Sequence, residues 1–175
     1  MSNNYIDNQK FFSEMSKWKE KVVEADLKDD PRPPITEYIG ECFWKIAEHL
    51  SFKSNFANYP FREDMIGDAV ENCLMYAHNF DPEKSKNPFS YFTQITYYAF
   101  IRRIEKEKKQ NFIKYKVLKN MDTSGTLSSW LKNNNFEEEK NPEEHLAEYF
   151  SLSKTDIEKF DKKKKTKNNE DSDSK

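Results

Sequence analysis

Apolar residues recur at intervals of three and four positions along most of this 175-residue chain. That spacing places them on one face of an α-helix. The first such segment predicts a helix over residues 9–27, which ends before the prolines of residues 31–34. Thr36 favours the start of a second helix over residues 37–52, because its side chain can cap the first turn. The pattern predicts an all-α fold.

The third predicted helix covers residues 62–79 and has two chemically different sides. At 100° per residue its core side consists of Ile66, Ala69, Val70, Cys73, Leu74, Ala77 and, just beyond it, Phe80. The opposite side carries three carboxylates and a methionine: Asp64, Asp68, Glu71 and Met75. A charged stripe of this kind is either a solvated surface or a docking surface, and an exposed methionine suits the second because it adapts to partner surfaces.

A fourth helix is predicted over residues 88–109, since Asn87 and Pro88 form a helix-start signal. Aromatic residues surround its axis, and its end is basic. One face combines Tyr91, Gln94, Tyr98, Arg102 and Lys109. A helix face on which tyrosines are followed by Arg and Lys is suited to binding nucleic acid, because aromatic rings stack on exposed bases and cations contact phosphates. The same residues also fit an aromatic core helix with a solvated basic end, so the residue types leave both interpretations open.

Helices 37–52, 62–79 and 88–109 form the minimal predicted core. The corresponding division of the chain has four parts. These are an N-terminal helix with a proline-rich linker (1–34), a compact helical domain (35–120), a linker with a short helix or peptide (121–160) and a disordered charged tail (161–175). The C-terminal extension is thus expected to be flexible and only partly helical.

Charge is abundant and segregated along the chain. Charged residues make up 34% of the sequence, and the mean hydropathy is −1.05. Residues 102–119 contain eight Lys and Arg against two Glu, whereas residues 136–161 contain nine acidic residues against three Lys. Either two partners of opposite charge or pairing of the two segments with each other would account for this.

Several classes of protein are disfavoured by the sequence. Cys42 and Cys73 lie on apolar helix faces, and the three histidines make no ligand spacing with them, so no disulfide, structural metal or other cofactor is expected. Glu63, Asp64 and Asp68 have no second acidic cluster or glycine-rich phosphate loop to form an enzyme site with them. No apolar run approaches the length of a membrane span, and no signal peptide is evident.

Two sequence stretches carry a family likeness. The first stretch is DMIGDAVENCLMYAHNFD, and the second, after a short polar turn, is NPFSYFTQITYYAFIRRI. Together they resemble region 2 of bacterial sigma factors, and more closely the late-gene sigma factors of T-even-like bacteriophages. The likeness covers residues 35–109 approximately. The chain departs from bacterial primary sigma factors at two points. It lacks their tandem tryptophans, with Ile95-Thr96 near that register and Tyr97-Tyr98 just beyond it, and it has Gly67 where they usually have Gln.

The resemblance implies a compact sigma region 2-like domain without catalytic residues, acting in the cytoplasm of an infected bacterium. The first stretch would bind the coiled coil of the largest subunit of host core RNA polymerase, through Glu63, Asp64, Asp68, Glu71, Asn72 and Met75. The second would recognise and melt a short A/T-rich −10-like element of a late promoter, through Tyr91, Gln94, Tyr97, Tyr98, Arg102, Arg103, Lys106 and Lys109. The alternative is a helical adaptor that binds polymerase or another partner and never opens DNA.

A short C-terminal motif suggests an additional partner. Leu146, Tyr149 and Phe150 have the spacing of sliding-clamp-binding peptides, although Glu143 occupies the place where those peptides usually have Gln. The resemblance implies that a phage sliding clamp and a late coactivator assist this protein, since too little apolar sequence follows residue 120 for a second DNA-reading module. The alternative is a helix that packs back on the domain.

Overall fold

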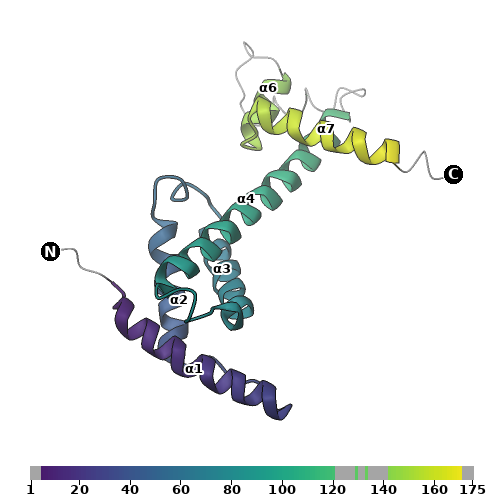
Figure 1. The fold of residues 1–175 in the computed structure, drawn as a ribbon. Coiled ribbons are helices and arrows are strands. Elements are labelled where there is room, and N and C mark those ends of the chain that lie inside the picture. The colour runs from purple at the N-terminus through teal and green to yellow at the C-terminus, as the bar shows by residue number, and fades with distance from the viewer. Residues whose placement is uncertain (1–4, 121–128, 130–132, 134–141, 171–175) are drawn as a thin grey trace. The chain divides into compact units, whose positions relative to one another are not determined.

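The computed structural model describes residues 5–120, 129, 133 and 142–170, and within these residues it contains helices and no β-strand (Figure 1). The prediction of an all-α fold is therefore confirmed. The elements are α1 (Asn8–Lys28), α2 (Glu37–Ser51), α3 (Arg62–Tyr76), the short 3₁₀ helix η1 (Ala77–Asn79), α4 (Pro88–Asn120), α6 (Pro142–Tyr149) and α7 (Lys154–Glu170). Of residues 121–160, predicted to be a linker with a short helix or peptide, those from 121 to 141 lie outside the described residues, apart from Ser129 and Asn133.

Local chemistry explains where the N-terminal helices begin. The Asp7 carboxylate accepts hydrogen bonds from the first backbone N–H groups of α1, and the Thr36 hydroxyl accepts one from the backbone N–H of Ile39 in α2. The Asn87 side chain likewise accepts a hydrogen bond from the backbone N–H of Ser90 at 3.1 Å. The helix starts predicted at Thr36 and Asn87 are thus confirmed.

Contacts divide the chain into two compact units, Met1–Arg103 and Ile104–Lys175. The core of unit 1 is a set of phenylalanine rings from separate elements. Phe92 of α4 lies 4.4 Å from Phe43 of α2, 5.8 Å from Phe11 of α1 and 6.0 Å from Phe80, measured between ring centroids. The N-terminal helix therefore shares one core with the helices that follow it, and the division between the two units falls within α4, after Arg103.

The rotation of α3 differs from the helical-wheel prediction. Leu74, which was placed on the core side, is 46% exposed, whereas Met65 is fully buried. The reason is that α3 packs against α4 as well as α2. Asp68 and Asn72 on the α4 side consequently become half-buried, and the apolar Leu74 turns toward solvent.

Unit 2 combines the C-terminal half of α4 with α6 and α7. Its buried cluster consists of Phe112, Tyr115, Leu146, Leu152 and Phe160. Helix α7 continues to Glu170, so residues 161–170 are helical where a disordered tail is expected from composition. The burial of Phe160 in the cluster holds the first turns of α7 against α4, and a helix that has already formed can add residues after them without a new nucleus.

Ion pairs surround the unit 2 cluster. Lys108 contacts Asp156 at 2.9 Å, Lys116 contacts Asp161 at 2.9 Å, Lys119 contacts Glu143 at 2.7 Å, and Lys159 contacts Glu105. Of the two explanations for the segregated charges, the structure therefore shows pairing of the basic and acidic segments with each other. No helix among the described residues is long and apolar enough to cross a membrane.

Candidate functional site

Helices α3 and α4 run antiparallel, and a buried cysteine lies at their contact. The Cys73 thiol lies 3.9 Å from the carbonyl oxygen of Phe92 and 3.6 Å from the hydroxyl of Thr96. Burial raises the pKa of Cys73 to about 11, so the thiol stays neutral. Close packing at this point sets the rotation of α3 and hence the residues it presents to solvent.

The exposed side of α3, which we call the α3 outer face, is both acidic and apolar. Its members are Glu63, Asp64, Gly67, Glu71, Leu74, Met75 and Tyr76. Leu74, Met75 and Tyr76 are each about half exposed, at 46%, 52% and 45%. Four residues predicted to bind polymerase, namely Glu63, Asp64, Glu71 and Met75, lie on this face. Leu74 and Tyr76 were missed by the sequence analysis, because helical periodicity placed Leu74 in the core.

The other two predicted polymerase-binding residues, Asp68 and Asn72, face α4 and contact its arginines, and Asp64 of the α3 outer face contacts one of these arginines as well. The Arg103 guanidinium lies 3.1 Å from the Asp64 carboxylate and 3.3 Å from that of Asp68. Arg102 donates a hydrogen bond of 2.6 Å to the side-chain oxygen of Asn72. We call these five residues the α3–α4 ion-pair network. Residues predicted to bind two different partners thus contact each other within unit 1.

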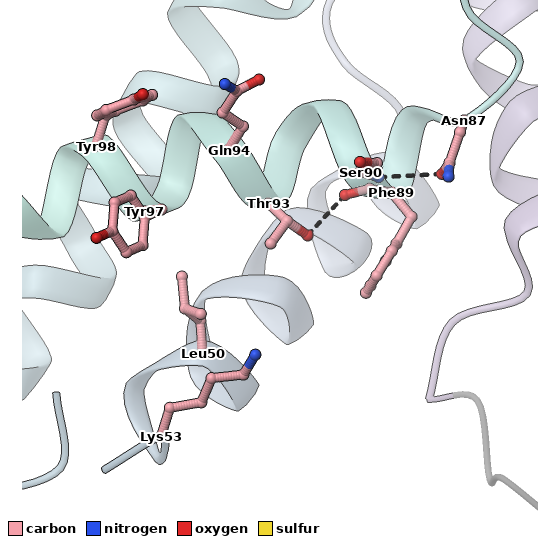
Figure 2. A pocket seen from close by; sticks show the side chains of 9 residues that line it. All are labelled: Leu50, Lys53, Asn87, Phe89, Ser90, Thr93, Gln94, Tyr97 and Tyr98. Atoms are coloured by element: carbon pink, nitrogen blue, oxygen red, sulfur yellow. Dashed lines mark hydrogen bonds between the residues drawn. The ribbon is translucent and has the colours of Figure 1, made fainter. Parts of the chain in front are cut away.

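A groove of about 600 Å³ runs between α4 and the end of α2 (Figure 2). Its lining, which defines the α4 groove, consists of Leu50, Lys53, Asn87, Phe89, Ser90, Thr93, Gln94, Tyr97 and Tyr98. Gln94, Tyr97 and Tyr98 were among the predicted DNA-binding residues. The contribution from the end of α2 was not predictable. Lys53 lies more than thirty residues before the groove residues of α4 in the sequence, and it belongs to no recognisable motif.

The two groove tyrosines differ in how firmly they are held. The Tyr97 ring makes an edge contact with Phe56 at 5.7 Å between centroids, and the Tyr98 ring lies 5.7 Å from Tyr97. Tyr97 is 41% exposed and Tyr98 is 52% exposed. Exposed rings beside the Gln94 amide and the Lys53 ammonium offer a stacking surface, a hydrogen-bonding group and a cation. This combination suits a flat polar ring attached to a phosphate.

The remaining predicted DNA-binding residues lie outside the groove. Tyr91 packs on Phe80 at 5.4 Å between centroids and is half-buried, and its burial raises the pKa of its hydroxyl. The helical wheel paired Tyr91 with Tyr98 as stacking residues, but the structure does not bring Tyr91 into the groove. Lys106 and Lys109 are exposed on the part of α4 that belongs to unit 2.

The C-terminal motif is folded into unit 2. Leu146 is fully buried in the cluster and Phe150 packs against it, whereas Tyr149 is 54% exposed. Two of the three residues that resemble a sliding-clamp peptide therefore have an intramolecular role in this structure. This is the arrangement of the alternative in which the segment packs back on the protein.

Among the described residues, no group of three or more His, Cys, Asp or Glu side chains is placed to hold a metal ion. Comparison of the chain with protein-family models and with curated proteins finds no match. Inferences about function therefore depend on the α3 outer face and the α4 groove.

Proposed function

We propose that this protein is a phage-type sigma factor that binds a bacterial core RNA polymerase and opens a short A/T-rich −10-like element of a late promoter. The observation that supports this is the pairing of two surfaces on one compact unit. An acidic and apolar face of α3 lies beside a helix whose exposed tyrosines line a groove. A protein that only binds a partner would need the first surface and not the second.

In this proposal the α3 outer face docks on the basic coiled coil of the largest polymerase subunit. Glu63 and Glu71 supply charge that complements a basic partner, which favours encounter and correct orientation. Leu74 and Met75 supply apolar area that becomes buried on docking, and such area contributes most of the affinity of a typical interface core.

The α4 groove would then receive an unstacked base from the melting promoter. Stacking on an aromatic side chain contributes about 1–3 kcal/mol per base, and A/T-rich DNA is the least costly to unpair. Tyr98 is the better candidate for the stacking ring, because Tyr97 is already in contact with Phe56. Lys53 would hold an adjacent phosphate from the opposite wall of the groove.

Recruitment would be assisted by a sliding clamp and a coactivator, which raise effective concentration without adding promoter contacts. Within the C-terminal motif, Tyr149 is the residue exposed to such a partner, and Leu146 would have to leave the unit 2 cluster to take part.

Run-off transcription with core RNA polymerase and an A/T-rich promoter tests the proposal. Glu63→Lys with Glu71→Lys should abolish transcription and polymerase pull-down while leaving helical circular dichroism unchanged, because both side chains are exposed. This pair is preferable to Asp64 and Asp68, whose charge reversal would also break the contacts with Arg103. Retained polymerase binding would overturn the docking assignment.

Tyr98→Ala tests the groove, with Tyr98→Phe as the matched control that keeps the ring. The alanine variant should lower open-complex formation, measured by permanganate footprinting, about tenfold or more while polymerase binding is retained. The phenylalanine variant should stay near the unmodified protein. Equal loss of polymerase binding and opening in the alanine variant would contradict a role in DNA melting.

Gly67 allows a gain-of-function test. A Cβ atom at Gly67 would meet no atom of another part of the protein within 4 Å, so a side chain can leave the backbone there toward open space. Because the sigma factors it resembles usually have Gln at this place, Gly67→Gln should strengthen polymerase binding in a pull-down. Weaker binding would indicate that a partner approaches the backbone closely at this point.

The adaptor alternative is favoured by one specific observation. Arg103, which was predicted to hold phosphate, contacts two α3 carboxylates. An adaptor would bind polymerase through the α3 outer face and give no run-off product from any promoter, and its binding would be insensitive to Tyr98→Ala.

A further inference from the structure

We propose that two exposed helix faces of this protein bind each other between separate copies of the chain, head to tail. One is the α3 outer face. The other lies on the part of α4 that belongs to unit 2, and we call it the α4 outer face; its members are Lys106, Lys109, Gln110, Ile113, Lys114 and Val117. The two faces carry opposite charge, expose apolar side chains, and arrange charge and apolar area in the same order along the helix.

The α4 outer face is the side of α4 that the described residues of unit 2 leave uncovered. Helices α6 and α7 pack on the other side, where Phe112 and Tyr115 are buried. Ile113 and Val117 are each 53% exposed and lie within about 40° of each other around the helix axis. Two apolar side chains adjacent on a solvent-facing surface suit burial by a partner.

Charges on the two faces have no ion-pair partner among the described residues. The lysines of α4 that face α6 and α7 form ion pairs. By contrast, Lys106, Lys109 and Lys114 are exposed and form none with any residue that the structure describes. The same holds for Glu63 and Glu71 of the α3 outer face. Surfaces of opposite charge steer two molecules together and fix their orientation.

The order of charge and apolar area matches when the two helices lie parallel. Each face has a charged pair followed by an apolar pair: Glu63 and Glu71, then Leu74 and Met75 on α3; Lys106 and Lys109, then Ile113 and Val117 on α4. In each helix the two pairs are centred about seven to eight residues apart, or about 11 Å along the axis. A parallel arrangement therefore sets carboxylates against ammonium groups and apolar pair against apolar pair simultaneously. An antiparallel arrangement would bury charge against apolar side chains.

Nucleic acid is the other class of partner that lysines attract, but the composition of the α4 outer face favours protein. Ile113 and Val117 lie among the lysines, where a nucleic-acid surface would carry polar or aromatic side chains for phosphates and bases. Each copy has both faces, so the association is heterologous and continues into chains or closed rings. Because two short helix faces bury less area than a standard interface, dissociation constants on the order of 10–100 µM are expected.

Self-association would cover the face through which we propose that α3 docks on polymerase. This consequence rests on the proposed function, whereas the self-association does not. At high concentration, copies would be held in the associated form. Polymerase would release single copies by competing for the α3 outer face, and the two complexes would exclude each other.

Sedimentation equilibrium of the full chain, at concentrations from about 5 to 300 µM, tests the proposal through the weight-average mass. The mass should rise with concentration at about 0.05 M salt and fall toward that of one chain at about 0.5 M salt, because salt screens the paired charges. A mass that stays at one chain under all conditions would overturn the proposal.

Charge reversal then identifies the two faces. Lys106→Glu with Lys109→Glu makes both faces acidic, and Glu63→Lys with Glu71→Lys makes both basic. Either variant alone should associate about tenfold more weakly than the unmodified protein, or less. An equimolar mixture of the two variants should recover the association, because every acidic face can then meet a basic one. A mixture that remains monomeric would overturn the pairing of these faces.

Lys21→Glu with Lys28→Glu makes the same change in charge on exposed positions of α1 and is the matched control. It should associate like the unmodified protein, and an equal loss would contradict the assignment. Circular dichroism identifies any variant that fails to fold, and Lys106→Gln with Lys109→Gln then replaces the charge reversal. If the lysine variant loses oligonucleotide binding while its mass is unchanged, the α4 outer face binds nucleic acid and the proposal is wrong. Run-off transcription tests the proposed function separately.

Discussion

The two units of this protein are both helical, yet different forces join their helices. In unit 1 the rings of Phe11, Phe43, Phe80 and Phe92 meet at the centre and join α1, α2 and α4 in a common core, to which α3 contributes Cys73. In unit 2 a smaller apolar cluster is surrounded by ion pairs between α4 and the helices that follow it. Apolar burial depends little on salt or pH, whereas ion pairs depend on both. Unit 1 should therefore be the robust part and unit 2 the part that responds to conditions.

The largest expected effect comes from the centre of unit 1. Phe92→Ala removes the ring shared by three neighbours and should lower the free energy of unfolding by about 3–5 kcal/mol. Hydrogen exchange measured by mass spectrometry should show faster exchange in α1, α2 and α3. Tyr98→Ala, on the same helix but exposed, serves as the control and should change stability by about 0.5 kcal/mol or less. Similar losses in both variants would contradict the location of the core.

Leu146→Ala is the corresponding change in unit 2. Leu146 is fully buried, so its truncation should cost about 2–5 kcal/mol locally. Exchange should accelerate in α6 and α7 while the peptides of α2 and α3 keep their protection. Tyr149→Ala, at an exposed neighbour, is the control. Loss of protection in both units at once would show that they unfold together and would contradict their independence.

Asp156 should make unit 2 sensitive to acid. Burial by itself would raise the pKa of Asp156, but hydrogen bonds from Ser153 and from the Lys108 ammonium outweigh it and hold the pKa below the ordinary value of 3.8. Because the pKa is lower in the folded state, the stabilisation is complete above the unfolded value and is lost as pH falls below about 4.

Asp156→Asn should reduce that acid dependence and cost about 1 kcal/mol near neutral pH. Hydrogen exchange of α7 between pH 3 and 6, corrected for intrinsic rates, would measure it. Glu158→Gln changes an exposed neighbour on the same helix and should leave the profile unchanged. An unaltered acid transition in the Asp156→Asn variant would contradict this assignment.

Salt should give the smallest effect. Raising the ionic strength from about 0.05 M to about 1 M screens exposed ion pairs, each of which contributes ~0.2–1 kcal/mol. Unit 2 should lose protection in hydrogen exchange under these conditions, and unit 1 should not. Loss confined to unit 1 would reverse the comparison between the two units.

Helical periodicity and capping residues were sufficient to predict most of the fold in unit 1. Thr36 and Asn87 mark helix starts, and the apolar spacing located the first three helices to within a few residues. The rotation of α3 was not predictable, because a helical wheel assumes one buried direction and α3 packs against two neighbours. The burial of Met65 and the exposure of Leu74 are the consequences.

The candidate site was predictable only in part, for a similar reason. Residue types identified exposed tyrosines on α4, but they could not show that Arg103 contacts Asp64 and Asp68, since such contacts depend on which helices are adjacent. In the same way, the sequence alone left open whether the basic segment pairs with the acidic one. The carboxylates that pair with the basic segment lie on α6 and α7. They become neighbours of α4 only because residues such as Leu146 are buried against it.

The two cysteines provide an internal probe of unit 1. Both are buried, at 2% exposure for Cys42 and 0% for Cys73, and burial raises the pKa of each thiol. Since the thiolate is the reactive form, alkylating reagents should modify them only in molecules whose helices have separated. Unit 2 contains no cysteine. The rate of alkylation would therefore report the opening of unit 1 alone, with the natural cysteines and without any introduced residue.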